Sequence, residues 1–368
     1  MRVVTPKAVH PEAHSPSKSS YDETILGTWE NHHLFSALVE LTYRCNLDCY
    51  FCYNDLDLAG KPLRFGDYER LFEEMRALGC LHLTLSGGEP LAHPDFFAIG
   101  AKARELGFVV RVKSNGHALG REMSSRLVRE IDPFIVEVSL HGASAATHDR
   151  QTRVAGSFER LLQNLEAMRA AGLRVKINTA LTRWNESEIE GMFAIADRFG
   201  MPFTLDPEVT PRDNGDRDPM RISASAEGLR RLVAVQANRR QGGEAEIRRE
   251  GDTEIHSRDP DRHCGAGASG IAIDPYGNVY PCVQWRRSIG NLHESTLEGI
   301  WRENSKLAEI RRLTVAAKGV VSSHGSQSPL VGFCPGVAEV LTGDPLTVPE
   351  STSTRAGILA ELPLHPVQ

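Results

Sequence analysis

The sequence contains no apolar run of the roughly 18 residues that a membrane-spanning helix needs. It has no excess of basic residues either, because 42 Lys and Arg are outnumbered by 48 Asp and Glu, which leaves nothing to attract a phosphate backbone. The first 20 residues lack the charged patch and apolar core of a secretory signal. We therefore expect a cytoplasmic globular protein that binds neither nucleic acid nor a membrane.

The cysteine content argues against a disulfide framework. There are seven cysteines, an odd number, in 368 residues, and three of them fall within eight positions. This spacing favours thiolate ligands for a metal in a reducing compartment. Cys80 stands apart, between a helical stretch and an apolar strand, and is interpreted as a small buried hydrophobic residue.

Between residues 37 and 206, short apolar runs rich in β-branched residues alternate with helical stretches, which is typical of βα units and a parallel sheet. Six such units predict an α/β fold, a partial (β/α)6 barrel that falls short of the closed eight-fold form. The helix Ser157–Ala171 illustrates the pattern, with Ser157 as its cap and Gly172 as its stop. The predicted strands are Ala37–Tyr43, Leu81–Leu85, Phe108–Lys113, Phe134–Leu140, Arg174–Leu181 and Pro202–Asp206.

Four unusual loops follow directly on predicted strands: residues 44–53, 86–90, 114–116 and 141–153. Because the carboxyl ends of parallel strands meet at one edge, all four loops are expected to converge on one mouth. The acidic segment Asp206–Asp218 at the end of the last strand is able to line this mouth, but an ordinary solvated loop is the favoured interpretation.

The first loop holds the motif Cys45-Asn-Leu-Asp-Cys49-Tyr-Phe-Cys52. A fully ligated 4Fe–4S cluster takes one cysteine per iron, so three thiolates leave one iron open to another ligand. Closely spaced cysteines also serve structural zinc sites that have a distant fourth ligand. From the triplet alone, an iron–sulfur site is favoured and a zinc site stays open.

The triplet, with the aromatic Phe51 just before its last cysteine, resembles the signature of the radical S-adenosylmethionine (SAM) superfamily. The resemblance implies that Cys45, Cys49 and Cys52 hold a 4Fe–4S cluster. Its open iron would chelate the amino and carboxylate groups of SAM, and Phe51 would pack near the adenine.

Further loops extend the resemblance. Gly87-Gly88-Glu89 follows the second predicted strand and is similar to the family's Gly-Gly-Glu motif, which meets the SAM amino group. Glycines allow the backbone to approach closely, and a carboxylate suits an ammonium group. The remaining positions that match family contacts to SAM are Asn115, Ser139 and Arg153.

A second cysteine set resembles the start of the twitch or SPASM domain, which binds auxiliary 4Fe–4S clusters in this superfamily. Cys264 and Cys282 bracket a predicted hairpin at residues 271–280, and Cys334 follows. A full SPASM domain has seven cysteines for two clusters, so only one auxiliary cluster is expected here. Its fourth ligand is open, with His263 and His324 as candidates, and a degenerate domain without iron is the alternative.

The resemblance implies reductive cleavage of SAM to a 5′-deoxyadenosyl radical that takes a hydrogen atom from a substrate. The favoured substrate is a ribosomally made peptide or protein side chain. The alternatives are a small natural-product molecule and a non-catalytic iron–sulfur scaffold. A reductant such as flavodoxin or ferredoxin and a separate peptide-carrier protein are the implied partners.

We predict five parts along the chain. They are an N-terminal arm (1–34), a radical SAM core (35–215), a connector (216–262), a reduced SPASM-like α+β domain (263–343) and a loosely ordered tail (344–368).

Overall fold

The computed structural model describes residues 20–241, 261–323 and 332–361, and a nine-stranded sheet forms its centre, in the order β6-β5-β4-β3-β2-β1-β7-β8-β9. The six predicted strands are all present, with ends displaced by at most three residues, and they pair in parallel. They are β1 Ser36–Glu40, β2 His82–Ser86, β3 Val109–Ser114, β4 Ile135–Ser139, β5 Val175–Ala180 and β6 Phe203–Asp206. The predicted α/β partial barrel is confirmed.

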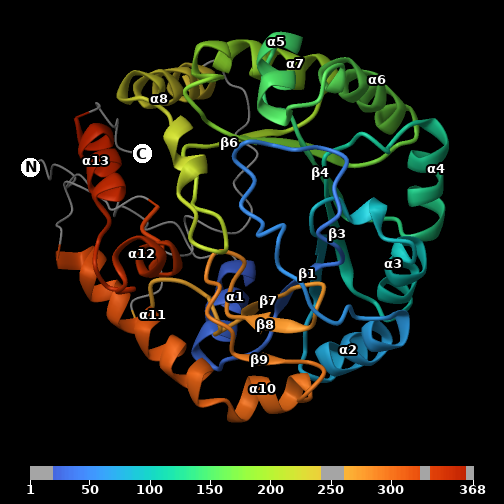
Figure 1. Ribbon diagram of the computed structural model, residues 1–368, viewed down its shortest axis with the longest axis vertical. Coiled ribbons are helices and arrows are strands. Elements are labelled where there is room, and N and C mark those ends of the chain that lie inside the picture. The colour runs from blue at the N-terminus through green and yellow to red at the C-terminus, as the bar shows by residue number, and fades with distance from the viewer. Residues whose placement is uncertain (1–19, 242–260, 324–331, 362–368) are drawn as a thin grey trace, which may run out of the picture.

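Helices surround the strands as an outer ring, which Figure 1 shows from α2 round to α8. This arrangement follows from the βα order, since each helix returns the chain to the start of the next strand. The helices of this half are α2 Phe65–Ala77, α3 Phe96–Glu105, α4 Arg121–Glu130, α5 Ala145–Thr152, α6 Ser157–Ala170, α7 Ile189–Phe199 and α8 Ala226–Gln241, with short 3-10 turns at Pro90–Ala92, Glu186–Glu188 and Asp218–Ile222.

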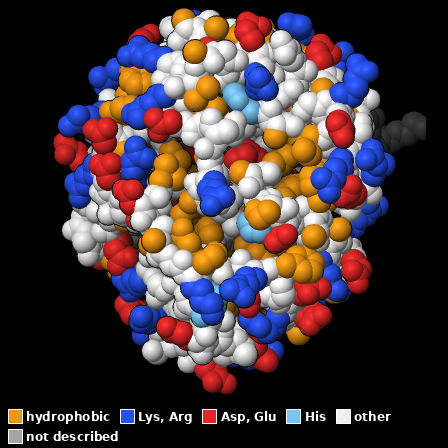
Figure 2. Space-filling model, turned by 45° about the vertical axis from the view of Figure 1, so that its right-hand side comes forward, with side chains coloured by type: hydrophobic (Ala, Val, Ile, Leu, Met, Phe, Trp, Pro, Cys, Tyr) orange, Lys and Arg blue, Asp and Glu red, His pale blue; other side chains and the backbone are white. Residues whose placement is uncertain are grey.

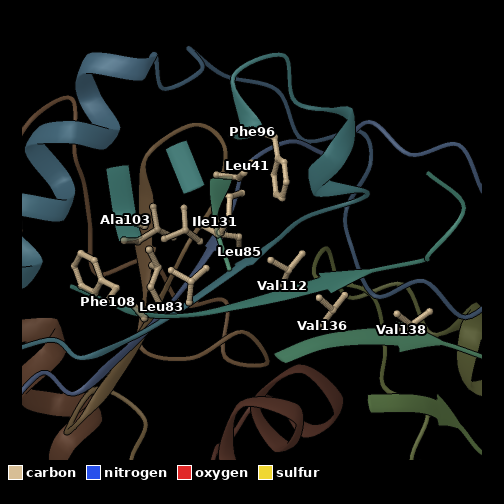
Figure 3. Close-up of a cluster of buried hydrophobic side chains, with 14 of the residues drawn as sticks. Leu41, Leu83, Leu85, Phe96, Ala103, Phe108, Val112, Ile131, Val136 and Val138 are labelled. Atoms are coloured by element: carbon tan, nitrogen blue, oxygen red, sulfur yellow. The ribbon is translucent and has the colours of Figure 1, made fainter. Parts of the chain in front are cut away.

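The hydrophobic core lies between the strands and this ring. Alternate strand residues such as Leu83, Val112 and Val136 are fully buried and belong to the same hydrophobic cluster as Phe96 of α3, which Figure 3 shows. The residues between them point to the opposite, concave face of the sheet, because side chains alternate along a strand. On the surface, hydrophobic side chains gather along a hollow in the middle of the face that Figure 2 presents.

Helix α6 shows one local difference from expectation. Leu161, Leu165 and Met168 are buried, and Gly172, the predicted stop beyond its end, has a φ of +76°. However, the N-cap is Gly156, not Ser157. The Ser157 hydroxyl donates to the Asp149 carboxylate at 2.7 Å, so the side chain is used to join α6 to α5.

The C-terminal part continues the same sheet. Strand β7 (Gly270–Ile273) pairs in parallel with β1, and β8 (Asn278–Tyr280) and β9 (Gly290–Asn291) add on in antiparallel pairs. The predicted hairpin is present, and its turn is fixed by Asp274, whose carboxylate accepts from the backbone N–H of Tyr276 and Asn278 at 2.9 Å each.

Four helices complete this part: α10 Leu297–Glu303, α11 Ser305–Ser323, α12 Pro335–Thr342 and α13 Glu350–Ala360, while the N-terminal part contributes α1 Ser20–Glu30. Helix α13 corrects the expectation of a loosely ordered tail from residue 344. It packs against α8 and buries Thr352 and Ala356, which fixes this segment. None of the helices within the described ranges is long and apolar enough to cross a membrane.

Candidate functional site

The cysteine triplet lies in the loop that leaves β1. The loop is pinned by its backbone, since the N–H of Asp48 and of Tyr50 donate to carbonyls at the end of α5, at 3.1 and 3.0 Å. Cys45 is exposed, whereas Cys49 and Cys52 are partly buried. The three thiols therefore stand together at the carboxyl edge of the sheet, where the sequence places them.

The electrostatics of the triplet fit a cationic centre. Burial raises the pKa of Cys52 to about 11. It raises the pKa of Cys49 further, with negative charge on Cys52 and Cys45 as the next causes. Three thiolates so close together need positive charge between them, and the irons of a cluster supply it.

Three thiolates are able to bind a single metal ion or three irons of a cluster. Within the described residues, no three or more Cys, His, Asp or Glu side chains are arranged to hold one metal ion. A four-iron cube instead binds each thiolate on a different iron, which keeps the sulfurs further apart.

Gly87 and Gly88 follow β2 and lie against the backbone that leads into the triplet. The Gly88 N–H donates to the Thr42 carbonyl at 2.7 Å. A Cβ on Gly87, which has a φ of +135°, would lie 2.3 Å from that carbonyl oxygen, and one on Gly88 would lie 2.7 Å from the Arg44 oxygen. Only glycine permits this approach, so the pair sets the position of the cysteine loop.

Glu89 is a buried carboxylate that joins two of the loops. It accepts from the Asn115 N–H at 2.8 Å, from the Ser114 hydroxyl at 3.0 and 3.1 Å, and from the Leu91 N–H at 3.2 Å. None of the described Lys, Arg or His residues pairs with it. Burial raises the pKa of Glu89 to about 7. A bound ammonium group would supply the cation that this carboxylate lacks.

Asn115 connects the loop after β3 to the triplet. Its side-chain amide donates to the Asn46 side chain at 2.8 Å and lies 3.7 Å from the Cys45 sulfur. Gly116 follows with a φ of +79°, which turns the chain back into the fold. The structure thus brings the Cys45, Glu89 and Asn115 loops into direct contact.

The other candidates surround the same loop at different distances. Arg153 donates to the Asp48 carboxylate at 3.1 Å and lies over the Tyr50 ring, 4.9 Å from its centroid. The Phe51 ring packs edge-on against His141, with centroids 4.8 Å apart. Ser139 ends β4 on the concave face, and its side chain makes no hydrogen bond to the described residues.

Two residues of the acidic segment Asp206–Asp218 also belong to the site, which corrects the interpretation of this segment as a merely solvated loop. Arg212 donates to the backbone carbonyls of Cys52 and Tyr50 at 3.0 and 3.3 Å. The Asp213 N–H donates to the Tyr53 carbonyl at 2.8 Å. The acidic segment Asp206–Asp218 therefore holds the cysteine loop in place.

A buried ion-pair network links this acidic segment to the C-terminal part. The Arg286 guanidinium contacts both Glu40 oxygens at 2.8 and 3.0 Å and the Asp213 carboxylate at 2.9 Å. Glu40 is fully buried at the end of β1. Burial raises the pKa of Asp213 to about 7, and Arg286 opposes this rise. No sequence motif marks the network, because its members are far apart in the chain.

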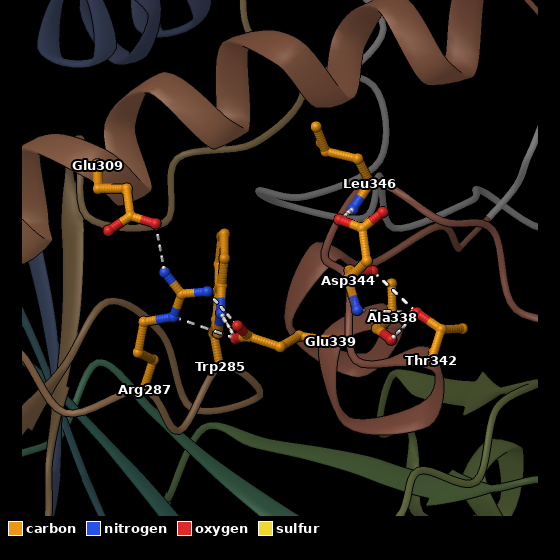
Figure 4. Close-up of polar contacts among 8 residues, drawn as sticks. All are labelled: Trp285, Arg287, Glu309, Ala338, Glu339, Thr342, Asp344 and Leu346. Carbon is orange, nitrogen blue, oxygen red and sulfur yellow. Dashed lines mark hydrogen bonds and ion pairs between the residues drawn. The ribbon is translucent and has the colours of Figure 1, made fainter.

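The second cysteine set is assembled by α12. Figure 4 shows Trp285 and Arg287 reaching Glu339 on this helix, and Arg287 also reaching Glu309 on α11. A Cβ on Gly336 would lie 2.6 Å from the Gln284 carbonyl oxygen, so the start of α12 packs directly on the segment after Cys282.

These contacts bring the three thiols together. Burial raises the pKa of Cys334, and negative charge on Cys282 and Cys264 raises it further. The His263 imidazole Nε2 lies 2.8 Å from the Phe333 carbonyl oxygen, which places this candidate ligand beside both cysteine segments. His324, the other candidate, lies outside the described residues.

Comparison with known proteins gives two family matches. The radical SAM superfamily matches residues 39–196, and the SPASM iron–sulfur cluster-binding domain matches residues 264–325. The first match contains the cysteine triplet, and the second contains Cys264 and Cys282, whereas Cys334 lies beyond its end.

Curated relatives align over both parts. The PqqA peptide cyclase of Xanthomonas euvesicatoria is 30% identical over 286 residues, 75% of this chain and 76% of that protein. The mycofactocin maturase MftC of Mycobacterium tuberculosis is 29% identical over 330 residues, which cover 84% of this chain and 80% of that protein. The AdoMet-dependent heme synthase of Methanosarcina barkeri is 28% identical over 296 residues, which cover 74% of this chain and 83% of that protein.

A solved structure shares the fold. Streptococcus suis SuiB bound to precursor peptide SuiA gives a TM-score of 0.62 at 16% identity, over 84% of this chain and 75% of that one. The chain therefore belongs to the radical SAM superfamily of enzymes, which bind a 4Fe–4S cluster and SAM, and its C-terminal part contains a SPASM iron–sulfur-binding domain.

Proposed function

We propose that this radical SAM enzyme modifies a ribosomally made peptide. When bound, the cluster and SAM supply a 5′-deoxyadenosyl radical that removes a hydrogen atom from the substrate. The observation that carries the proposal is the alignment with a peptide cyclase and a mycofactocin maturase across both the radical SAM and the SPASM parts. The partial barrel, whose edge strands β6 and β9 do not pair with each other, supports the entry of an extended chain.

The triplet and the loops around it have distinct roles in this proposal. Cys45, Cys49 and Cys52 hold the cluster and leave one iron for SAM. Glu89 pairs with the SAM ammonium group, because it is a buried carboxylate without a cation. Gly87 and Gly88 let the backbone approach closely enough to place that carboxylate.

The remaining candidates orient SAM. Asn115 stands between Glu89 and Cys45, where its amide can direct the bound nucleoside. Arg153 provides a cation for the SAM carboxylate beside the triplet, Ser139 offers a hydroxyl without another partner, and Phe51 provides an apolar face for the adenine. Such positioning lowers the barrier by holding the reacting atoms in place.

Cys264, Cys282 and Cys334 hold a single auxiliary 4Fe–4S cluster in this proposal, and the domain runs over residues 263–343. The mutual charge effects among the three thiols support it. His263 is the better-placed candidate for a fourth ligand, since it lies next to Cys264 and against the residue before Cys334.

The proposal includes the cellular setting. A reductant such as flavodoxin or ferredoxin supplies the electron that SAM cleavage requires, and a separate carrier protein delivers the peptide. The enzyme works in the cytoplasm, because free thiols and iron–sulfur clusters require a reducing compartment.

The test is modification of a short peptide encoded beside the gene. The anaerobically reconstituted enzyme, with SAM and reductant, should change the mass of that peptide, and Cys49→Ala should abolish the change. Cys80→Ala is the matched control, because Cys80 is buried against β1 and β2, away from both cysteine sets. An unmodified peptide in the presence of active SAM cleavage would refute the peptide assignment.

A small-molecule substrate is the second candidate, and the alignment with the heme synthase favours it. Mass spectrometry of cell extracts incubated with the enzyme distinguishes the two. A SAM-dependent change in a low-molecular-mass compound, with every peptide unchanged, would establish this alternative.

A further inference from the structure

The concave face of the sheet carries a row of charged side chains directly below the cysteine loop. Lys113 on β3, Glu137 on β4 and Lys176 on β5 are register neighbours, so their side chains lie on the same face and at the same level. Arg111 lies two residues before Lys113 on that face. The interior of a closed barrel is packed with bulky apolar residues, so such a row indicates a different use of the space.

Two of these cations have unused donors. Arg111 and Lys113 approach Glu137 at 3.8 and 3.7 Å, beyond hydrogen-bond distance. Neither side chain donates a hydrogen bond within the described part of the chain, and the Arg111 Nε is buried without an acceptor. Buried polar groups in native proteins almost always have partners, so the buried Arg111 Nε is suited to a ligand that the protein itself does not provide. The half-exposed Lys113 amine beside it is open to the same ligand.

The charge balance of the row is positive. Two cations, Arg111 and Lys113, face one carboxylate, Glu137, which also accepts from Asn178 at 3.1 Å. Glu40, at the carboxyl end of β1, is already paired with Arg286. An anion that enters the barrel therefore meets an excess of positive charge here.

The row is within reach of the triplet. Lys113 precedes Asn115 by two residues, about 7 Å along a strand, and the Asn115 amide lies 3.7 Å from the Cys45 sulfur. An anionic group held by Arg111 and Lys113 would leave the rest of a substrate beside the cysteine loop.

We propose that Arg111 and Lys113 bind a carboxylate of the substrate, from an Asp or Glu side chain. The proposal rests on the proposed function and narrows its substrate to an acidic peptide. The planar guanidinium of Arg111 can bind the two carboxylate oxygens together, and Lys113 adds a third donor. A carboxylate is the anion that an unmodified peptide carries.

The test compares two capped tripeptides, acetyl-Gly-Glu-Gly-amide and acetyl-Gly-Gln-Gly-amide, that differ in one carboxylate. NMR titration of the reconstituted holoenzyme with SAM measures both dissociation constants. We expect roughly tenfold tighter binding of the Glu peptide, the size of one charge-assisted hydrogen bond. Arg111→Gln and Lys113→Gln should each remove most of this preference.

The matched controls are Lys102→Gln and Arg169→Gln, on the outer helices α3 and α6, where each cation pairs with a glutamate three residues away. Both should retain the preference. Equal binding of the two peptides by the wild type, or a preference that survives in both Arg111→Gln and Lys113→Gln, would overturn the proposal.

The SAM carboxylate is the other possible ligand, and a second measurement separates it from the substrate. If Arg111→Gln and Lys113→Gln weaken SAM binding and leave the peptide preference unchanged, the cations serve SAM and the proposal is wrong. Formation of 5′-deoxyadenosine without peptide tests the proposed function separately, since it should continue in both variants.

Discussion

Glu89 is the residue on which the SAM assignment depends most. It is 2% exposed, it accepts hydrogen bonds from two loops, and it has no cationic partner among the described residues. Buried carboxylates are costly unless a charge compensates them, so an empty site keeps this one close to protonation. A bound ammonium would reverse that balance.

We predict that Glu89→Gln weakens SAM binding by about tenfold or more, the loss of a charge-assisted contact. Equilibrium binding of SAM to the reconstituted protein measures this. Glu105→Gln, on the exposed side of α3, is the control and should bind as the wild type does.

A pH dependence follows from the same residue. Because burial raises the pKa of Glu89 from 4.5 to about 7, the ligand-free protein must lose a proton there before it pairs with an ammonium. SAM affinity should therefore fall as the pH is lowered from about 8 to about 6, and Glu89→Gln should flatten this dependence. The same shift makes the ligand-free protein less stable as the pH rises from 4.5 through about 7. Equal pH profiles for the two proteins would contradict the assignment.

Motif residues could be located from the sequence because their spacing is local. Cys45, Cys49 and Cys52 fall within eight positions, and Glu89 follows a recognisable glycine pair. The role of Arg286 could not be predicted from the sequence, since its partner Glu40 lies 246 positions away and neither residue belongs to a motif. The free donors of Arg111 were equally hidden, because only the register of β3 and β4 places that side chain beside Glu137.

At the scale of elements, the contact of the Gly87 loop with the end of β1 sets the site. We predict that Gly87→Ala lowers the free energy of unfolding by at least about 2 kcal/mol more than Gly107→Ala, because its Cβ would lie 2.3 Å from the Thr42 oxygen. Gly107 also has a positive φ but has open space around it, so it isolates the backbone strain. Urea denaturation measures the free energy of unfolding of both variants. An equal decrease for Gly87→Ala and Gly107→Ala would show that the close approach of Gly87 to Thr42 is unimportant for stability.

The strands of the first half were predictable because apolar runs and turn residues are local signals. The end of β1 was placed at Tyr43, three residues late, since the chain leaves the sheet where Gly87 and Gly88 meet it. Helix α13 was missed because its polar sequence shows no apolar face, and packing against α8 stabilises it. The pairing of β7 with β1 depends on tertiary structure and has no local signal.

At the scale of the whole molecule, the Glu40–Arg286–Asp213 network joins the barrel, the acidic segment Asp206–Asp218 and the C-terminal part. We predict that Arg286→Met destabilises the protein by about 3–5 kcal/mol, because it leaves two buried carboxylates unpaired. Arg302→Met, which removes an exposed pair with Glu298, should cost less than about 1 kcal/mol. Urea denaturation measures the free energy of unfolding of both variants. A similar decrease for Arg286→Met and Arg302→Met would show that the network does not hold the parts together.

Iron content tests the second cysteine set. We predict about eight irons per reconstituted chain, four for each of two clusters, and about four for Cys334→Ala. Cys80→Ala should keep the wild-type content. About four irons in the wild type would mean that the C-terminal part holds no cluster.

The central claim is that the triplet at the end of β1 makes this chain a SAM-cleaving enzyme. The direct measurement is 5′-deoxyadenosine, quantified by chromatography after anaerobic incubation of the reconstituted protein with SAM and reductant. The account predicts that the wild type forms it and that Cys49→Ala forms none. No product from iron-loaded wild type, or as much from Cys49→Ala, would contradict the account.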